Sequence, residues 1–252
     1  MNLKLKNKVA LIIGASKDIG REISISLAKQ KVNLIMVARS KKDLLELKKL
    51  VDCYSLNNHI ISIDLSIKKN NSILIKKIKK NYKSIDIIVH NIGGSLGISN
   101  PFASSSSWNK VWYSNLGIAI DINNNFIPEM INKKWGRIVH ISSGITSTFQ
   151  GNSAYASAKC AVEGYIKSVS KTISKDNVII SGVAPGVIEK KKGYFYFLQK
   201  NDKEKLNEYY KNNLPINRMC SQLEVANAVV FLCSDLSSYM PGSIIKLDGI
   251  GN

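Results

Sequence analysis

The sequence predicts an α/β fold in which a parallel sheet of about seven strands carries helices on both faces. Three observations predict it: short apolar runs recur along the chain, segments of helical length alternate with them, and the runs are apolar without interruption. An uninterrupted apolar run is typical of a strand that is buried on both faces. Strands separated by helices run parallel through right-handed crossovers. The expected architecture is therefore a single Rossmann-type, doubly wound sheet.

The expected elements follow from this pattern in chain order. The strands are expected at 9–14, 32–38, 59–65, 85–92, 136–143, 177–185 and 243–249. The helices are expected at 20–31, 41–51, 66–82, 105–133, 152–175 and 221–234. No linker divides the chain, so we expect 1–252 to form one domain. The long insertion 187–213 is too apolar for a linker, and we expect it to be a substrate lid.

Composition and charge exclude several classes of protein. Of the 252 residues, 44% are hydrophobic, which suffices for a sizeable core. No run of about 18 apolar residues occurs, so we expect no membrane partner. The cysteines and histidines lack metal-ligand spacing, so we expect no metal site and reduced cysteines in a cytoplasmic protein. The net charge is +18, but the lysines are spread along the whole chain, so we expect no nucleic-acid partner.

The segment "GASKDIG", residues 14–20, joins the first expected strand to the first expected helix. Such a turn gathers backbone N–H groups that attract a pyrophosphate. The residues expected to contact a nucleotide there are Gly14, Ser16, Lys17, Asp18, Ile19 and Gly20. Asp18 stands where such loops usually carry a further glycine. We expect it to be the helix N-cap, accepting the N–H of Gly20 or Arg21 and pointing away from the phosphates; the alternative is that it faces them.

The end of the second expected strand indicates which nucleotide binds. A site for NAD usually carries an acid here that holds the ribose 2′-hydroxyl, and this strand end has none. It offers Arg39, and the phosphate loop offers Lys17; two cations suit a 2′-phosphate. We therefore expect NADP(H) as the preferred cofactor, with NAD(H) as the alternative. A further alternative is that both cations are solvated surface charges.

The segment "YASAK", from Tyr155 to Lys159, begins an expected helix and indicates proton transfer. A tyrosine and a lysine four residues apart share one helix face. A phenol titrates at about pH 10, and a nearby ammonium together with the positive nicotinamide of an oxidised cofactor would lower its pKa and make it a usable acid–base. The alternative is an amphipathic helix with a surface lysine. Upstream, an expected strand ends in Ser142 and Ser143, whose hydroxyls suit a substrate carbonyl, and Asn115 lies in a long expected helix.

Further segments fall in the order and spacing of one known family. They are "HNIGG" at 90–94, "SNL" at 114–116, "GRIVHISS" at 136–143, "APG" at 184–186 and the final "LDG". From about Lys8 to Gly249 the chain resembles the short-chain dehydrogenases/reductases, in the branch that contains 3-oxoacyl-carrier-protein reductases and many sugar and steroid dehydrogenases. The resemblance implies one NADP(H)-binding catalytic domain.

The resemblance also implies roles for individual residues. Tyr155 would be the general acid–base, Lys159 would hold the nicotinamide ribose and tune the tyrosine, and a serine would polarise the carbonyl. Asn115 would hold a water that links Lys159 to solvent, and Asn91 would steady the central strand beside the cofactor. The other implied cofactor contacts are Asp64 and Leu65 near the adenine and Pro185, Gly186 and Ile188 around the nicotinamide.

Two serines compete for the carbonyl. The usual distance from the family's serine to its tyrosine selects Ser142, whereas alignment of the strand from Gly136 selects Ser143. A slip of one residue in a strand turns every side chain to the other face, while a loop loses a residue easily. We therefore favour Ser143, with Ser142 as the alternative.

Some residues depart from the family's pattern. Beside Asp18, they are His90 and Ile92, where Asn and Ala are usual, and Lys190, where many members have a threonine that touches the cofactor's amide. Lys190 begins a run of three lysines in the expected lid, followed by aromatic residues at 194–197. Aromatic faces suit sugars or acyl chains, and lysines suit an anion; the alternative is that the aromatics pack onto their own domain.

We expect an NAD(P)(H)-dependent oxidoreductase that exchanges hydride between a nicotinamide and a carbonyl or secondary alcohol. The favoured form is a ketone reductase acting on a sugar-derived or other anionic small substrate. The alternatives are a 3-oxoacyl-carrier-protein reductase and a non-catalytic NADP(H)-binding regulator. The resemblance implies a homo-oligomer, either a tetramer or a dimer, in the cytoplasm.

Overall fold

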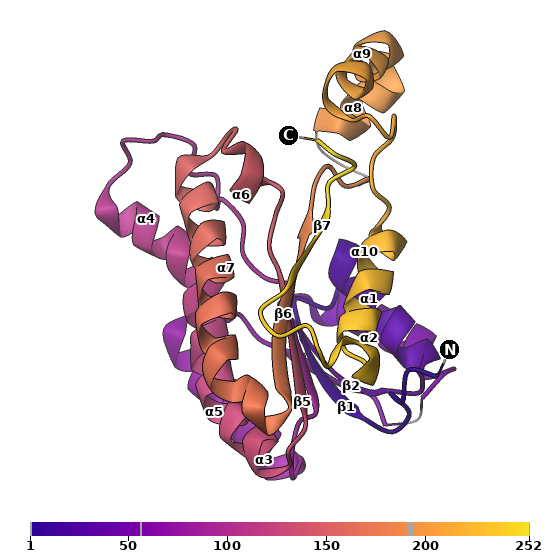
Figure 1. Ribbon diagram of the computed structural model, residues 1–252, viewed down its shortest axis with the longest axis vertical. Coiled ribbons are helices and arrows are strands. Elements are labelled where there is room, and N and C mark those ends of the chain that lie inside the picture. Colours follow the sequence, from indigo (N-terminus) through magenta and orange to yellow (C-terminus); the bar gives the residue numbers. More distant parts are fainter. Residues whose placement is uncertain (1, 56, 191–193, 252) are drawn as a thin grey trace.

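The fold prediction is confirmed by the computed structural model, which describes residues 2–55, 57–190 and 194–251 (Figure 1). In these residues seven strands pair in parallel, in the order β3-β2-β1-β4-β5-β6-β7. The order reverses between β1 and β4, which makes the sheet doubly wound. The strands are β1 (Val9–Ile13), β2 (Asn33–Ala38), β3 (His59–Ser62), β4 (Ile87–His90), β5 (Gly136–Ile141), β6 (Val178–Pro185) and β7 (Ile244–Leu247).

The helices form where the sequence predicts them, and among the described residues three further α-helices lie outside the predicted helical segments. In chain order, all of these helices are α1 (Asp18–Lys29), α2 (Lys41–Val51), α3 (Lys68–Asn81), α4 (Ser105–Trp112), α5 (Ile118–Asn132), α6 (Ile145–Thr148), α7 (Ser153–Ile173), α8 (Tyr194–Asn201), α9 (Lys203–Asn213) and α10 (Gln222–Leu232), with 3-10 turns at Ser174–Asp176 and Asp235–Ser237. The three further ones are α6, α8 and α9.

Each of the five inner strands, β2, β1, β4, β5 and β6, lies between two apolar layers, which explains their uninterrupted apolar runs. On β1, Ala10 and Ile12 face one layer, whereas Leu11 and Ile13 face the other, and all four are fully buried. Helices α1, α2 and α10 cover the first face, and α3, α5 and α7 cover the second (Figure 1). The helical patterns between the strands thus supply the apolar surfaces that bury both faces of the sheet.

The expected helix 105–133 is not one regular α-helix. Helices α4 and α5 are joined by a π-helical turn, Tyr113–Gly117. Such a turn inserts an extra residue and re-aims side chains, and it often occurs at functional sites. A Cβ on Gly117 would lie 2.3 Å from the ring of Tyr113, so this turn needs a glycine where the ring crosses it. Asn115 lies in the middle of the turn.

The expected lid contains helices α8 and α9, which follow the end of β6 and project beyond the sheet (Figure 1). Two residues of the predicted lysine run, Lys191 and Lys192, lie outside the described residues. Leu198 of α8 and Leu206 of α9 are buried, so the two helices pack through their apolar residues. None of the described helices is both long enough and apolar enough to cross a membrane.

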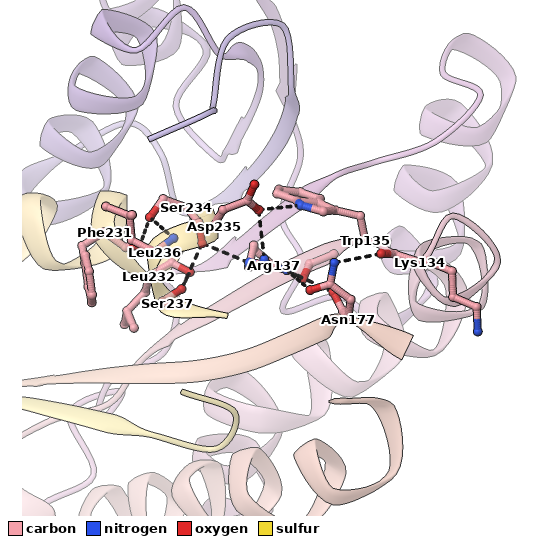
Figure 2. A network of polar contacts seen from close by, with 11 residues as sticks. Lys134, Trp135, Arg137, Asn177, Phe231, Leu232, Ser234, Asp235, Leu236 and Ser237 are labelled. Carbon is pink, nitrogen blue, oxygen red and sulfur yellow. Dashed lines mark hydrogen bonds and ion pairs between the residues drawn. The ribbon is translucent and has the colours of Figure 1, made fainter. Parts of the chain in front are cut away.

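At its amino end, strand β5 is anchored by a fully buried arginine (Figure 2). Arg137 donates to the carbonyl oxygens of Ser234 at 3.1 Å, Gly136 at 2.8 Å and Asn177 at 3.0 Å. It also donates to the carboxylate of Asp235 at 3.2 Å. The Trp135 ring lies 4.6 Å from the guanidinium carbon. One side chain thus ties β5 to the loop before β6 and to the end of α10.

Candidate active site

Most predicted site residues converge at the carboxyl ends of the strands, where two cavities adjoin. The first, of about 580 Å³, is lined by the ends of β4, β5 and β6, by α7 and by the lid, and we call it the Tyr155 cavity. The second, of about 350 Å³, lies at the ends of β1 and β2, and we call it the Arg39 cavity. Asn91, Ile92 and Gly93 belong to both walls, so the cavities form one trough. Doubly wound sheets bind ligands in this crevice.

The phosphate loop is packed so closely that two of its positions need glycine. Gly14 has a φ of +81°, and a Cβ there would lie 2.0 Å from the carbonyl oxygen of Asn91. A Cβ on Gly20 would lie 2.0 Å from the carbonyl oxygen of Gly14. Asn91 Nδ2 donates to that same oxygen at 2.9 Å, which joins β1 to β4 as the resemblance implied. The loop residues that line the trough are Gly14, Ser16, Lys17 and Ile19.

The prediction that Asp18 caps helix α1 is wrong. Lys17 occupies the N-cap position, and no side-chain cap hydrogen bond forms there among the described residues. Asp18 has a φ of +47°, in the left-handed region, and its side chain is exposed outside both cavity walls as described. Asp tolerates this conformation better than most residues do. The backbone here therefore has the conformation that favours glycine, and Asp18 substitutes for it without facing the trough.

Strand β2 brings Arg39 into the wall of the Arg39 cavity together with Lys17, as predicted. Each cation has a carboxylate near it. Lys17 Nζ lies 3.1 Å from Asp43 Oδ2. Hydrogen bonds from Ser66 and the charge of Arg39 hold the pKa of Asp64 below its ordinary value. Asp64 and Leu65 also line this cavity, as the resemblance implied.

Helix α7 presents Tyr155 and Lys159 on one face, as their spacing predicts. Asn152 caps the helix, because its Oδ1 accepts the N–H of Tyr155 at 3.0 Å. Lys159 is 4% exposed, and its Nζ donates to the carbonyl oxygen of Ile141 at 2.7 Å. Burial lowers the pKa of Lys159 to about 8, against the opposing charge of Glu163. An ammonium has three donors, so donors remain for a ligand in the Tyr155 cavity, whose wall includes Lys159.

Taken together, the chain's own groups do not lower the pKa of Tyr155, and the effect of a bound nicotinamide on it stays a prediction. Burial raises this pKa above its ordinary value, and Ser143 lowers it by less. The ammonium of Lys159 lies 5.6 Å from the centre of the Tyr155 ring and is held by Ile141. In this state the phenol stays protonated at neutral pH, which suits a proton donor.

The two serines at the end of β5 have different partners. Ser142 Oγ donates to Glu163 Oε1 at 2.7 Å, and Thr146 Oγ1 donates to the same oxygen at 2.8 Å. Ser143 instead lines the cavity with Tyr155, close enough to lower the pKa of the phenol. The carboxylate of α7 therefore fixes the loop after β5 and leaves Ser143 beside the tyrosine, so the geometry favours Ser143 over Ser142.

Asn115 lies in the π-helical turn and braces the loop after β4. It is buried, its Oδ1 accepts the N–H of Gly94 at 3.0 Å, and its Nδ2 donates to the Gly94 carbonyl at 2.9 Å. Nδ2 also donates to the carbonyl of Val111 at 2.8 Å. A Cβ on Gly93 would lie 2.0 Å from Asn115 Oδ1. The side chain therefore holds the trough wall in place, and its contact with a water near Lys159 stays a prediction.

The far wall of the Tyr155 cavity comes from the end of β6 and the lid. Pro185, Gly186 and Ile188 line it, as the resemblance implied for the nicotinamide. A Cβ on Gly186 would lie 2.9 Å from the Cα of Asp248, so the backbone approaches the C-terminal segment closely. The lid residues in this wall are Lys190, Tyr194, Phe195 and Tyr196. The predicted aromatic and cationic side chains thus face the cavity in part.

A buried polar cluster beneath the trough was not predicted. His90 ends β4, His140 is its partner in register on β5, one residue before the end of that strand, and their rings stack with centroids 4.5 Å apart. His90 Nε2 lies 2.8 Å from Asn123 Oδ1, and Asn123 Nδ2 donates to Tyr165 Oη at 3.1 Å. Burial lowers the pKa of His90 to about 4 and that of His140 well below its ordinary value. In the sequence each histidine follows an Ile-Val pair near the end of an expected strand, and this was the available signal.

Comparison with known proteins decides the family. A family model described as enoyl-(acyl carrier protein) reductase matches residues 14–249. The 3-oxoacyl-(acyl-carrier-protein) reductase of Aquifex aeolicus is 31% identical over 251 residues, which cover 99% of either chain. The chain belongs to the short-chain dehydrogenase/reductase family. Membership confirms the resemblance and makes this chain an oxidoreductase of that family.

Two solved structures are similar to this short-chain dehydrogenase/reductase over nearly its whole length. The L-sorbose reductase of Gluconobacter frateurii, in complex with NADPH and L-sorbose, has a TM-score of 0.90 and 25% identity over 99% of this chain and 98% of its own. The 3-oxoacyl (acyl-carrier-protein) reductase of Agrobacterium tumefaciens, with NADP bound, has a TM-score of 0.89 and 25% identity over 98% of this chain and 95% of its own. The described residues contain no group of His, Cys, Asp and Glu suited to a metal ion.

Proposed function

We propose that the chain is an NADP(H)-dependent reductase that acts on a small ketone, sugar-derived or otherwise anionic. The observation that carries the proposal is the continuous trough, with Lys17 and Arg39 at one end and Ser143, Tyr155 and Lys159 at the other. A dinucleotide with a 2′-phosphate has matching chemistry at its two ends. The solved relatives that contain NADP and NADPH support this choice of cofactor.

The residues of the trough fit this cofactor. The close-packed Gly14 and Gly20 leave backbone room for a pyrophosphate, and Lys159 keeps donors for the nicotinamide ribose. The residues proposed to hold the cofactor are Gly14, Ser16, Lys17, Ile19, Gly20, Arg39, Asp64, Leu65, Asn91, Tyr155, Lys159, Pro185, Gly186 and Ile188. When bound, NADPH would supply the hydride that reduces the carbonyl carbon.

The chain's own residues orient the carbonyl and supply the proton. Ser143 and Tyr155 line the same cavity, and Ser143 is close enough to act on the pKa of the phenol, so the two hydroxyls can donate to one carbonyl oxygen. Negative charge develops on that oxygen during reduction, and both hydroxyls stabilise it. Tyr155 donates its proton to the oxygen, which yields the alcohol, and Lys159 stabilises the phenolate that remains. Asn115 keeps the loop at Gly93 and Gly94 in place.

The variant Tyr155→Phe tests the mechanism. It removes the proton donor but keeps the ring, so we expect turnover to fall by about 10²–10⁴-fold while NADPH affinity changes by less than about twofold. Loss of NADPH absorbance measures turnover, and fluorescence titration measures affinity. The matched control is Tyr239→Phe, since Tyr239 is 99% exposed and lies outside the trough wall as described. Undiminished turnover in Tyr155→Phe would contradict the assignment of Tyr155 as the proton donor.

A second candidate function is reduction of a 3-oxoacyl group on a carrier protein. The names of the curated relatives favour this function. The net charge of +18 favours it as well, because it would attract an acidic carrier protein. An assay of acetoacetyl-carrier protein against L-sorbose, each with NADPH, separates the two candidates by kcat/KM. A non-catalytic regulator would bind NADPH and reduce neither. We also propose that the chain acts as a dimer or tetramer, which light scattering measures.

A further inference from the structure

An ion pair stands at the rim of the Arg39 cavity. Lys17, Arg39 and Ser40 belong to the cavity wall, and Asp43 contacts two of these three residues from the first turn of helix α2. Lys17 Nζ lies 3.1 Å from Asp43 Oδ2, with the lysine side chain 70% exposed. The N–H of Asp43 donates to Ser40 Oγ at 3.3 Å. The carboxylate therefore lies beside the groups that would receive a 2′-phosphate.

Each of the two cations in the cavity wall has a carboxylate close to it, and Lys42 adds a further positive charge near Asp43. Lys17 is paired with Asp43, and Arg39 lies near enough to Asp64 to lower the pKa of that carboxyl. A hydrogen bond from Ser40 and the charge of Lys17 hold the pKa of Asp43 below its ordinary value, so this carboxylate is ionised at neutral pH. A phosphate monoester carries a charge of about −1.5 to −2. A 2′-phosphate that approaches Lys17 must therefore approach a like charge on Asp43.

We propose that Asp43 sets the preference between NADPH and NADH by competing with the 2′-phosphate for Lys17. The inference rests on the proposed function. The lysine of this pair is 70% exposed and the aspartate 24%, so solvent screens the lysine's side of the pair and the phosphate can draw Lys17 away from Asp43. The carboxylate stays in place, because it belongs to a helix that starts at the cavity wall, and it continues to repel the phosphate. NADH has a hydroxyl at this position, so it meets no such repulsion.

The variant Asp43→Asn tests the proposal with binding alone. It keeps the size of the side chain and removes the charge, so the NADPH dissociation constant should fall about threefold to tenfold at low salt. The NADH dissociation constant should change by less than about twofold, because the 2′-hydroxyl is neutral. At about 1 M salt the gain should largely disappear, since the screening length falls to about 3 Å.

The matched control is Glu46→Gln, which makes the same change in net charge on the same helix. Glu46 is exposed and lies outside the wall of the Arg39 cavity as described, so its NADPH affinity should stay near that of the wild type. An NADPH affinity that is unchanged or weaker in Asp43→Asn overturns the proposal, as does an equal gain for NADH. A wild-type chain that binds neither nucleotide overturns the proposed function itself, and with it this inference.

Discussion

A buried cation lies at each end of strand β5: Arg137 of the strand itself at the amino end, and Lys159 of helix α7 at the carboxyl end. The two differ in how many of their hydrogen-bond donors have a partner. At the amino end, Arg137 donates to backbone and carboxylate oxygens from four residues (Figure 2). At the carboxyl end, the one hydrogen-bond partner of Lys159 among the described residues is the carbonyl oxygen of Ile141. A cation whose donors are all used stabilises structure, whereas one with unused donors is available to a ligand. The comparison separates a structural end of the strand from a functional end.

The choice of residue type follows the same division. The guanidinium of Arg137 stays charged even though burial lowers its pKa, and its planar donors reach several acceptors at once. Lysine is a compact point charge whose pKa shifts readily, and burial lowers that of Lys159 to about 8. The functional end thus carries the group whose ionisation responds to its surroundings.

The largest expected effect comes from Lys159→Met. Because Lys159 would stabilise the Tyr155 phenolate, we expect turnover to fall by about 10²–10⁴-fold. Burial of the ammonium costs folding free energy, so the melting temperature should stay the same or rise. Steady-state kinetics and thermal unfolding of the same preparation check both. A clear loss of stability in this variant would show that the carboxyl end of β5 is structural as well.

The variant Arg137→Met should have the opposite profile. Removal of the guanidinium leaves buried acceptors without donors, so we expect a loss of about 3–5 kcal/mol in the free energy of unfolding. Urea unfolding measures it. The matched control is Arg218→Met, since the exposed pair of Arg218 with Glu224 contributes about 0–1 kcal/mol. Equal losses in the two variants would contradict the structural role of Arg137.

The histidine pair beneath the trough predicts a loss of stability in acid. The pKa of His90 is about 4 in the folded state, against an ordinary value of 6.5 that applies to the unfolded chain. Between these two pH values the unfolded chain therefore binds the proton more readily than the folded one. Stability is therefore complete above about pH 6.5 and falls by about 3 kcal/mol as the pH drops to about 4. Urea unfolding at several pH values measures the slope. The variant His90→Asn should flatten it, whereas His59→Asn, at an exposed position, should not.

The smallest expected effect belongs to the phosphate loop. Asp18 has a positive φ, so Asp18→Gly should stabilise the fold by about 0.5–1 kcal/mol and Asp18→Ala should destabilise it. Thermal unfolding compares the two. NADPH affinity should change by less than about twofold in Asp18→Gly, because the side chain lies outside the trough wall as described. A large gain in NADPH affinity would mean that Asp18 faces the phosphates after all.

The sequence predicted the strands well because the inner ones are apolar runs buried on both faces, a pattern that local sequence alone reveals. It also predicted that Tyr155 and Lys159 share a helix face, since that follows from local geometry. The sequence could not predict the hydrogen bond from Lys159 to Ile141 or the raised pKa of Tyr155. Both depend on how β5 packs against α7. The positive φ of Asp18 was missed because an aspartate just before a helix also fits an N-cap, although the glycine usual at this position pointed to such a conformation.

The π-helical turn and the choice between the two serines at the end of β5 also depended on contacts that the sequence does not reveal. The insertion at Tyr113–Gly117 is invisible in an apolar pattern that fits one long helix. The choice between Ser142 and Ser143 rested on strand register, and the structure gives it a physical basis, because Glu163 holds Ser142. Contacts between elements distant in the sequence decide both features, and no local pattern encodes them.

The most direct test of the division along β5 is kcat/KM for NADPH-dependent ketone reduction by Arg137→Met and Lys159→Met, measured where each variant is fully folded. We predict a value within about threefold of the wild type for Arg137→Met and at least about 100-fold below it for Lys159→Met. A folded Arg137→Met variant that has lost turnover, or a Lys159→Met variant that retains it, would contradict the account.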